Sequence, residues 1–436
     1  MKFKLFIFIS FLISVSGWNI KAQEAEKVNQ FSVNLQLRPR AEYRNGYKTP
    51  LNEDDKSAAF INQRARLSME YQREGLSAGL SLQNVSVWGE YPISNAGKSN
   101  TVVNEAWAQL KNDNGLFVKF GRQVLHYNDG RLLSVADWNQ AARAHDALKF
   151  GYQTSLHQLD FVLAYNQDAD KNSGGSYFYA YGVPYKTLQT VFYQYNGVKT
   201  FTPSFIFINV GLENGDPLKN QSKLANLQTM GTNLIYSPVK ELRLHGIVYY
   251  QTGKTKSDKD VAAYLLSLKA EYDAIKQLKF SAGTDILSGE EIDSPDANDS
   301  YNAFNTLYAG NHGHYGVMDL FVDAPYRTGM NVGIWDKYVG ASLRPSPKYT
   351  IGLTYHHFSI PTDVYNAGEK LKKGLGSEVD LQFDYNIMKD VKLTCGYSTF
   401  FGTPTLDYVK GGDHQTWQDW AFMTVNVNPR IFSAKW

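Results

Sequence analysis

The stretch FSVNLQLRPRAEYR, Phe31 to Arg44, decides the fold class. Its odd positions are apolar or small, and its even positions are all polar: Phe31, Val33, Leu35, Leu37, Pro39, Ala41 and Tyr43 against Ser32, Asn34, Gln36, Arg38, Arg40, Glu42 and Arg44. Because successive side chains of a strand point to opposite faces, this pattern predicts a strand with one apolar and one polar face. Its length exceeds the five or six residues common in soluble strands and suits a tilted strand that crosses a bilayer of about 30 Å.

A second stretch, Ala59 to Gln72, repeats the alternation and again carries charge on one face. Two consecutive charge-rich faces are hard to bury in a soluble sandwich, but they are accommodated in a water-filled lumen. Each apolar wall position is therefore expected to alternate with a polar lumen position. This pairing explains a mean hydropathy of −0.38 in a membrane protein.

Similar segments recur to the end of the chain, joined alternately by short turns and long polar stretches, which is the pattern of an outer-membrane barrel. We predict an all-β chain folded as a single transmembrane antiparallel β-barrel with short periplasmic turns and long extracellular loops. About eighteen strands fit the length, and sixteen are also compatible with it. The weakest strand assignments fall after Leu116 and between Tyr177 and Tyr195.

Composition excludes several other classes of protein. With 20% charged residues and one long apolar run, near the start, the chain is no bundle of membrane helices. A net charge of +2 does not indicate a nucleic-acid binder, and one cysteine, Cys395, excludes an intrachain disulfide framework.

The first residues have the pattern of a targeting signal. Lys2 and Lys4 precede the apolar run Leu5 to Val15, and Ala22 offers a small residue at a cleavage point. We expect residues 1–22 to be a signal peptide and residues 23–436 to form the barrel, in the outer membrane of a Gram-negative bacterium.

Arginine is unevenly distributed, with nine of the 13 falling between Arg38 and Arg143. Several guanidinium groups in one lumen would concentrate anions there. The candidate pore-lining residues are Arg38, Arg40, Arg44, Arg64, Arg66, Arg122, Arg131, Arg143, Glu105, Asp129 and Asp137. The alternative for each is structural, because arginines and acids can satisfy one another across the wall.

The segment GRQVLHYNDGRLLSVADWNQAARAHDALKFGYQ, Gly121 to Gln153, resembles the signature of the alginate-export family of outer-membrane proteins. The stretches LTYHHFSI and GLGSEVDLQFDYNIMKDVKLTCGYSTF are also similar to that family. The resemblance implies a monomeric eighteen-stranded barrel with an Arg-lined, loop-gated constriction that passes a polyuronate. By motif match it places Arg122 and Arg131 in the lumen, with Asp129 and Asp137 as their ion-pair partners. The later strands hold little arginine, which separates this chain from the exporters.

The sequence thus predicts a channel, not an enzyme, for anionic saccharides or small anionic solutes. The alternatives are a general porin, a barrel hydrolase and a plugged structural or adhesive barrel. We expect outer-membrane lipid as the surroundings, no nucleic-acid partner, no cofactor and no metal. The histidines His312, His314, His356 and His357 do not form a converging ligand set, and the acidic loop from Glu290 to Ser300 is expected to be solvated.

Overall fold

The computed structural model describes residues 28–436 apart from 93–100, 171, 173–176, 178–184, 215–222, 295–298 and 322–330. The predicted signal peptide, residues 1–22, lies outside this range. The described chain is almost entirely β-structure. Its sheet strands are β1 (Gln30–Asn45), β2 (Ala58–Arg73), β3 (Leu76–Val87), β4 (Thr101–Lys111), β5 (Leu116–Gln123), β6 (His145–Gln153), β7 (His157–Tyr165), β8 (Thr187–Tyr195), β9 (Phe201–Asn214), β10 (Lys223–Val239), β11 (Leu242–Lys254), β12 (Asp260–Ile275), β13 (Leu278–Leu287), β14 (Ile334–Ser346), β15 (Tyr349–Ser359), β18 (Gly374–Met388), β19 (Val391–Gly402), β20 (Gln418–Val427) and β21 (Arg430–Lys435).

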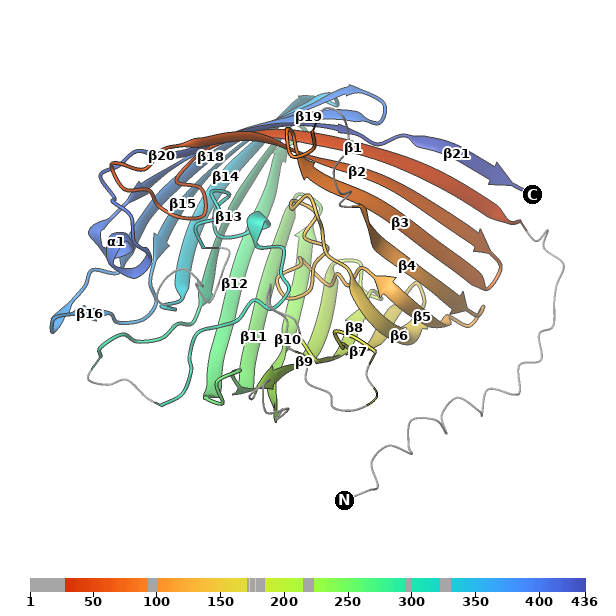
Figure 1. Ribbon diagram of the computed structural model, residues 1–436, viewed down its shortest axis with the longest axis horizontal. Helices are drawn as coiled ribbons and strands as arrows, with labels where there is room; N and C mark the ends of the chain where they lie inside the picture. The colour runs from red at the N-terminus through yellow and green to blue at the C-terminus, as the bar shows by residue number, and fades with distance from the viewer. Residues whose placement is uncertain are drawn as a thin grey trace, which may run out of the picture.

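These strands form one closed antiparallel sheet (Figure 1). Each strand pairs with the next along the chain, and β1 pairs with β2 on one edge and with β20 and β21 on the other. Because β20 and β21 are successive parts of one wall strand, interrupted at Asn428 and Pro429, the wall has 18 strands. The predicted fold class and the count of eighteen are confirmed.

The connections alternate in length as predicted. At the end where β1 begins and β21 ends, β2 and β3 are joined by residues 74–75, and β18 and β19 by residues 389–390. At the opposite end lie the long loops, including residues 124–144 between β5 and β6 and residues 288–333 between β13 and β14. Smaller elements occur in these loops: a 3₁₀ turn (Asn311–Gly313), the hairpin of β16 (Tyr365–Asn366) and β17 (Glu369–Lys370), and helix α1 (Pro404–Lys410).

The outward face of the wall is apolar because one side-chain set of each strand meets lipid. On β1, the odd residues Leu35 and Leu37 are each 40% exposed, whereas the even residues Arg40 and Glu42 are buried. The alternation read from Phe31 to Arg44 therefore gives the true orientation of this strand. Exposed aromatic rings such as Trp88, Trp335 and Trp417 lie near strand ends, where aromatic girdles of such barrels are found.

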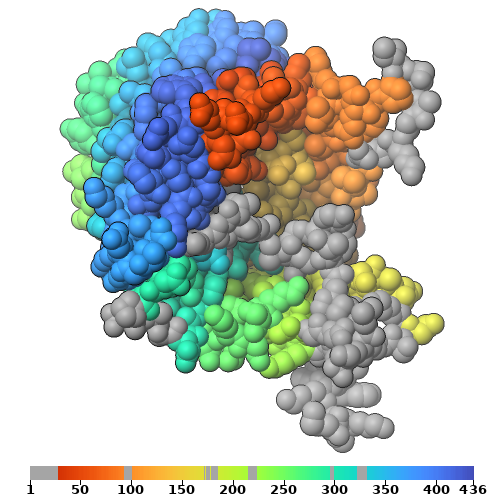
Figure 2. Space-filling view, turned by 60° about the vertical axis from the view of Figure 1, so that its left-hand side comes forward, coloured from red at the N-terminus to blue at the C-terminus, as the bar shows by residue number. Residues whose placement is uncertain are grey.

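The hydrophobic core lies inside the barrel. The 124–144 loop and the described part of the 288–333 loop fold into the lumen, where they hydrogen-bond to each other: Tyr308 N donates to Leu132 O over 2.9 Å, and Gly310 N to Gly130 O over 3.0 Å. In Figure 2, which turns the loop end forward, gold residues lie recessed between the red-orange and blue strands.

The expectation that every wall strand presents a polar face to the lumen is wrong for strands β8 to β12. Their inward residues are largely apolar and fully buried, for example Leu188, Ile208 and Leu265. These side chains are covered by loop residues such as Leu133 and Phe304, which belong to the same buried cluster. The apolar inner wall is the surface on which the two loops pack.

Candidate functional site: the loop-lined lumen

A ladder of arginines projects inward from β1 and β2. The register places Arg38 directly opposite Arg64 and Gln36 opposite Arg66. Like charges directly opposite each other in an antiparallel pair are destabilising unless a counter-charge lies between them. The arrangement therefore requires an acid from elsewhere in the chain.

Asp137, in the 124–144 loop, supplies that acid. Its carboxylate lies 3.0 Å from Arg38 Nη1 and 2.6 Å from Arg64 Nη1. Burial raises the pKa of Asp137, but Arg64 and Arg38 outweigh burial, so the pKa lies below its ordinary value. The sequence-based pairing of Asp137 with Arg122 or Arg131 is wrong, because the loop bends back over β1 and β2.

The same ladder also holds the backbone of this loop. Arg64 donates to the carbonyl oxygens of Gln140 over 2.5 Å and of Asn139 over 2.7 Å, and Arg40 donates to the carbonyl of Trp138 over 2.9 Å. The Arg40 guanidinium lies 4.1 Å from the centroid of the Trp138 ring. These arginines are anchors that fasten the loop to the wall.

Glu42 neutralises the loop end of the ladder. The Glu42 side chain is buried. Arg40 Nε lies 2.8 Å from its Oε1 atom, and Arg44 Nη2 lies 2.8 Å from its Oε2 atom. Asn62 donates to this carboxylate over 2.8 Å, and Trp420 Nε1 over 3.3 Å. Arg40 and Arg44 are thus engaged by a carboxylate that has no exposure to solvent.

Arg131 ties the 124–144 loop to the far wall. Its guanidinium, buried, lies 2.6 Å from Asp129 and 3.0 Å from Asp285 on β13, and it donates to Tyr315 Oη over 3.2 Å. The predicted pairing of Arg131 with Asp129 is present. Burial and the Arg131 charge lower the pKa of neighbouring His314 to about 4, so this ring is neutral at pH 7.

Arg143 joins the two loops. It donates to the carbonyl oxygens of Tyr308 and of Ala309, the latter over 3.0 Å. Beside this contact, His312 stacks on Trp138 with ring centroids 3.9 Å apart and lies 2.6 Å from the Asp319 carboxylate. Tyr47, in the loop after β1, donates to the same carboxylate. Three loops are therefore connected through side chains inside the barrel.

Two inward-facing cations form no ion pair within the described part of the chain. Arg66 donates to Gln83 Oε1 over 2.6 and 3.0 Å, and Lys119 Nζ lies 3.5 Å from the centroid of the Trp107 ring. Both side chains are partly exposed, on the wall toward the short-turn end from the Asp137 contact. Glu105 also faces inward, on β4, and has no described hydrogen-bond or ion-pair partner.

Arg122 does not lie in the lumen, so the prediction from the motif is wrong. On β5 the inward residues include Phe117 and Gln123, both buried, and Lys119, whereas Arg122 belongs to the opposite set. It pairs across the outer surface with Asp146, 2.9 Å away. The alternation Leu116, Val118, Phe120 in the sequence already assigns even positions of this strand to the lipid face.

The opposite wall carries an acidic cluster that the sequence reasoning missed. Asp336 accepts from His356 Nδ1 over 2.9 Å, Asp380 lies 3.6 Å from His356 Nε2, and Glu378 accepts from Met318 N over 2.8 Å. All of these acids are buried under the 288–333 loop. Strand alternation could have placed Asp380 inward, because it falls between the outward apolar residues Val379 and Leu381.

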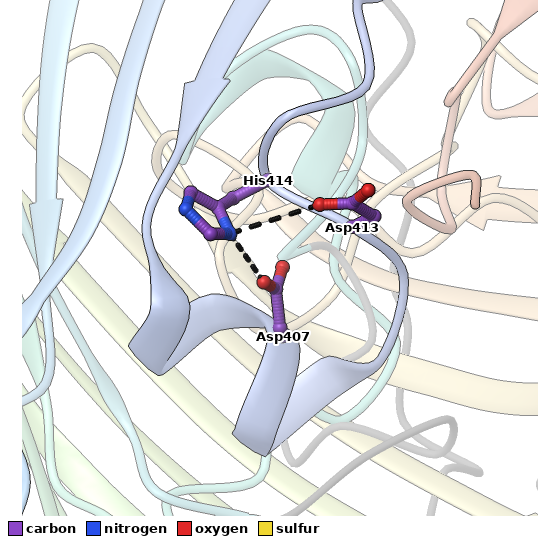
Figure 3. Close-up of side chains that lie close together, drawn as sticks. All are labelled: Asp407, Asp413 and His414. Carbon is purple, nitrogen blue, oxygen red and sulfur yellow. Dashed lines mark hydrogen bonds and ion pairs between the residues drawn. The ribbon is translucent and has the colours of Figure 1, made fainter. Parts of the chain in front are cut away.

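The histidine pairs weighed in the sequence behave as structural groups. His356 faces inward and His357 outward, on opposite faces of β15 as predicted. The described residues contain one grouping with metal-ligand spacing, which had not been expected: Asp407, Asp413 and His414 near α1 (Figure 3). His414 Nδ1 lies 2.5 Å from Asp407 and 3.8 Å from Asp413, so this nitrogen is already engaged by a carboxylate of the same group.

No helix in the described ranges is long and apolar enough to cross a membrane. The closed 18-strand wall, its apolar outer face and its loop-filled lumen define an outer-membrane β-barrel. The model of the alginate export family matches residues 30–406, and the chain belongs to that family.

Solved structures from Acinetobacter baumannii and Pseudomonas aeruginosa have a similar fold. OccAB2 of Acinetobacter baumannii and OpdO of Pseudomonas aeruginosa each superpose with a TM-score of 0.60 at 12% identity, covering 92% of this chain and 98% of theirs. The outer membrane protein opdK of Pseudomonas aeruginosa gives 0.58 at 12% identity, covering 94% and 99%. At this identity the likeness concerns the fold. No curated protein matches the sequence closely enough to count as a relative.

Proposed function

We propose that the protein is an outer-membrane channel that passes anionic saccharides and other small anions without covalent chemistry. The observation that carries this proposal is the state of Arg66 and Lys119, which face inward, are partly exposed and form no ion pair with a described residue. A carboxylate or sulfate on a passing solute would find hydrogen-bond donors there that the protein itself leaves available.

The burial of several acidic residues also supports selectivity for anions. Asp285, Asp336 and Glu378 are at most 1% exposed, so the 288–333 loop shields their charges from the lumen water. Glu105 and Glu70 act on Lys119 and partly offset the basic wall, but neither forms an ion pair with Arg66 or Lys119 in the described part of the chain. We infer that the two cations without an ion pair give the lumen wall its preference for anions.

A general porin is the second candidate, and a specific observation favours it. Arg38, Arg40, Arg44 and Arg64 are all engaged by Asp137, by Glu42 or by carbonyls of the 124–144 loop. In that case the two loops set a size limit, and charge has little effect on passage.

Reversal potentials of the purified channel in planar bilayers under a KCl gradient separate the two candidates. We expect anion preference in the wild type, reduced about threefold in Arg66→Ser and in Lys119→Ser, since one charge acting over about 7 Å of water contributes about 0.6 kcal/mol. Oligouronates should block the current of the wild type.

Arg122→Ser is the matched control, because that arginine lies on the outer face beside Asp146. Its selectivity should equal that of the wild type. Unchanged selectivity in both lumen variants would favour the general porin, and a wild type that prefers cations would refute the proposal of an anion channel.

A further inference from the structure

A row of four polar side chains crosses the otherwise apolar outer wall near the loop end of β13, β14, β15 and β18. The register aligns Thr284 with Lys337, Lys337 with His357, and His357 with Ser377. All four belong to the outward set, because the adjacent inward residues, among them Asp336 and His356, are buried.

Lys337 is set apart from the other cations of this surface. Near the loop ends of the described strands, the outward-facing basic side chains are Arg122, Lys254 and Lys337. Arg122 lies 2.9 Å from Asp146, and Lys254 lies 2.8 Å from Asp260. Lys337 has no carboxylate partner among the residues that the structure describes, since neighbouring Asp336 points inward to His356. An unpaired charge at a membrane surface needs an anion from outside the chain.

The local contacts hold the Lys337 ammonium in place. Its Nζ lies 3.6 Å from the centroid of the Trp335 ring and donates to Ser359 Oγ over 3.2 Å. The Trp335 ring is itself oriented by a 2.8 Å hydrogen bond from Nε1 to Thr284 Oγ1. The ammonium retains further N–H donors, and they face the outside of the barrel.

His357 lies directly across the ladder from Lys337. Its Nδ1 is 3.3 Å from Ser377 Oγ, and no hydrogen bond of Nε2 is found in the described part of the molecule. Ser377 Oγ is 2.8 Å from Tyr355 Oη. Two basic side chains placed opposite each other repel when both are charged, and an anion bound between them removes the repulsion.

The depth of this row matches the outer edge of the bilayer. Between Lys337 and Pro345, the outward residues Val339, Ala341 and Leu343 are exposed or half-buried and apolar. Eight residues of a strand tilted by about 40° span about 20 Å of the membrane normal, close to the apolar band of about 25 Å of such barrels. Lys337 is therefore at the level of outer-leaflet headgroups.

We propose that Lys337 and His357 bind a phosphate group of the phosphorylated glycolipid that forms the outer leaflet of the outer membrane. Trp335 and Tyr355 flank the phosphate as interfacial aromatic groups, and Thr284 and Ser377 complete the polar row. This inference rests on the outer-membrane location and is independent of what the lumen passes.

Native mass spectrometry of the folded, detergent-solubilised barrel tests the proposal. The barrel is titrated with bisphosphorylated lipid A, with the same lipid after removal of both phosphates, and with inorganic phosphate. The wild type should bind the phosphorylated lipid at least about tenfold more tightly than the dephosphorylated one, as loss of one charge-assisted contact predicts. Lys337→Gln should lose most of that difference, and His357→Gln a smaller part.

Lys254→Gln is the matched control, since it removes an outward-facing lysine that forms an ion pair with Asp260. This variant should bind the phosphorylated lipid as the wild type does. The proposal would be overturned if Lys337→Gln bound the phosphorylated lipid as tightly as the wild type does. It would also be overturned if the wild type bound the phosphorylated and dephosphorylated lipids equally. Inorganic phosphate that competes at the same concentration would indicate a free-anion site and equally overturn a lipid site. Channel conductance should be the same in all three variants, so failure here is distinct from failure of the channel proposal.

Discussion

Asp137 illustrates how one carboxylate decides the role of several arginines. It lies between the guanidinium groups of Arg38 and Arg64, and its own side chain is 49% exposed. Two charge-assisted contacts of this kind are strong enough to hold a loop on a wall that would otherwise repel itself. The same contacts reduce the positive charge that the ladder presents to the lumen.

Replacing Asp137 with asparagine should therefore raise anion preference. The change leaves the side chain almost the same size but removes the counter-charge of Arg38 and Arg64, so we expect the anion-to-cation permeability ratio to rise about threefold or more. Reversal potentials in a KCl gradient measure the effect. Asp146→Asn, which removes the partner of outward-facing Arg122, should leave the ratio unchanged. A fall in anion preference in Asp137→Asn would contradict the account of the ladder.

At the scale of elements, the 124–144 and 288–333 loops are parts of the core of this barrel. Leu133 is fully buried and forms a parallel bridge with Tyr308, which joins the two loops. Both loops pack on the apolar inner faces of β8 to β12. Burial of this surface holds the loops inside the lumen, and the arginine contacts set their position.

Leu133→Ala should loosen both loops without unfolding the wall. A cavity at a fully buried leucine costs about 2–5 kcal/mol, and the cost falls on the packing of the loops because Leu133 lies in the 124–144 loop and outside the hydrogen-bonded wall strands. Single-channel recordings should show larger and more frequent current fluctuations than the wild type.

Leu148→Ala provides the comparison, since Leu148 is outward-facing on β6 and 37% exposed. Its traces should match those of the wild type. If Leu133→Ala showed no more current fluctuation than the wild type, the position of the loops would not depend on this core.

At the scale of the whole molecule, closure of the wall depends on the last strand. β20 covers β1 from Leu37 to Asn45, and β21 covers it from Gln30 to Asn34. The pairing of β19 ends at Val391, opposite Val427, so β21 has β1 as its strand neighbour in the described sheet. Asn29 and Trp436 exchange backbone hydrogen bonds of 2.8 and 3.0 Å at the end of this seam.

Removing residues 429–436 should prevent stable closure. The first five residues of β1 would lose a strand partner, and each unsatisfied backbone group in lipid costs several kcal/mol. The folded, heat-modifiable band on unboiled SDS gels should be lost or greatly reduced. Trp436→Ala keeps the backbone ladder and should retain that band. A truncated chain that migrates as a folded barrel would show that β20 alone closes the wall.

Much of the wall could be predicted because strand alternation is a local property. The outward and inward sets of β1 and β2 follow directly from residues such as Leu35 and Arg64, and lipid on one side makes the pattern regular. The same rule assigns Arg122 to the outer face; the prediction failed there because a motif resemblance took precedence over the local pattern.

The partners in the lumen could not be predicted in this way. Asp137 lies 99 residues from Arg38, and Tyr308 lies 165 residues from Arg143. A sequence of alternating faces does not show whether a long loop extends outward or returns into the barrel. The apolar inner faces of β8 to β12 indicate that the loops return into the barrel. Without the fold, however, the sequences of these strands show only a weak alternation of polar and apolar residues.

The sequence by itself determined the fold class and which face of β1 and β2 meets lipid, because both depend on periodicity between near neighbours; it left sixteen or eighteen wall strands open, and the structure has eighteen. Only the tertiary structure decided that five of the eight candidate arginines hold the inward loops in place and that Arg66 and Lys119 have no ion-pair partner among the described residues. The reason is physical: closing the sheet brings charges from distant segments within hydrogen-bond distance, and the pairing that results depends on positions that no local pattern records.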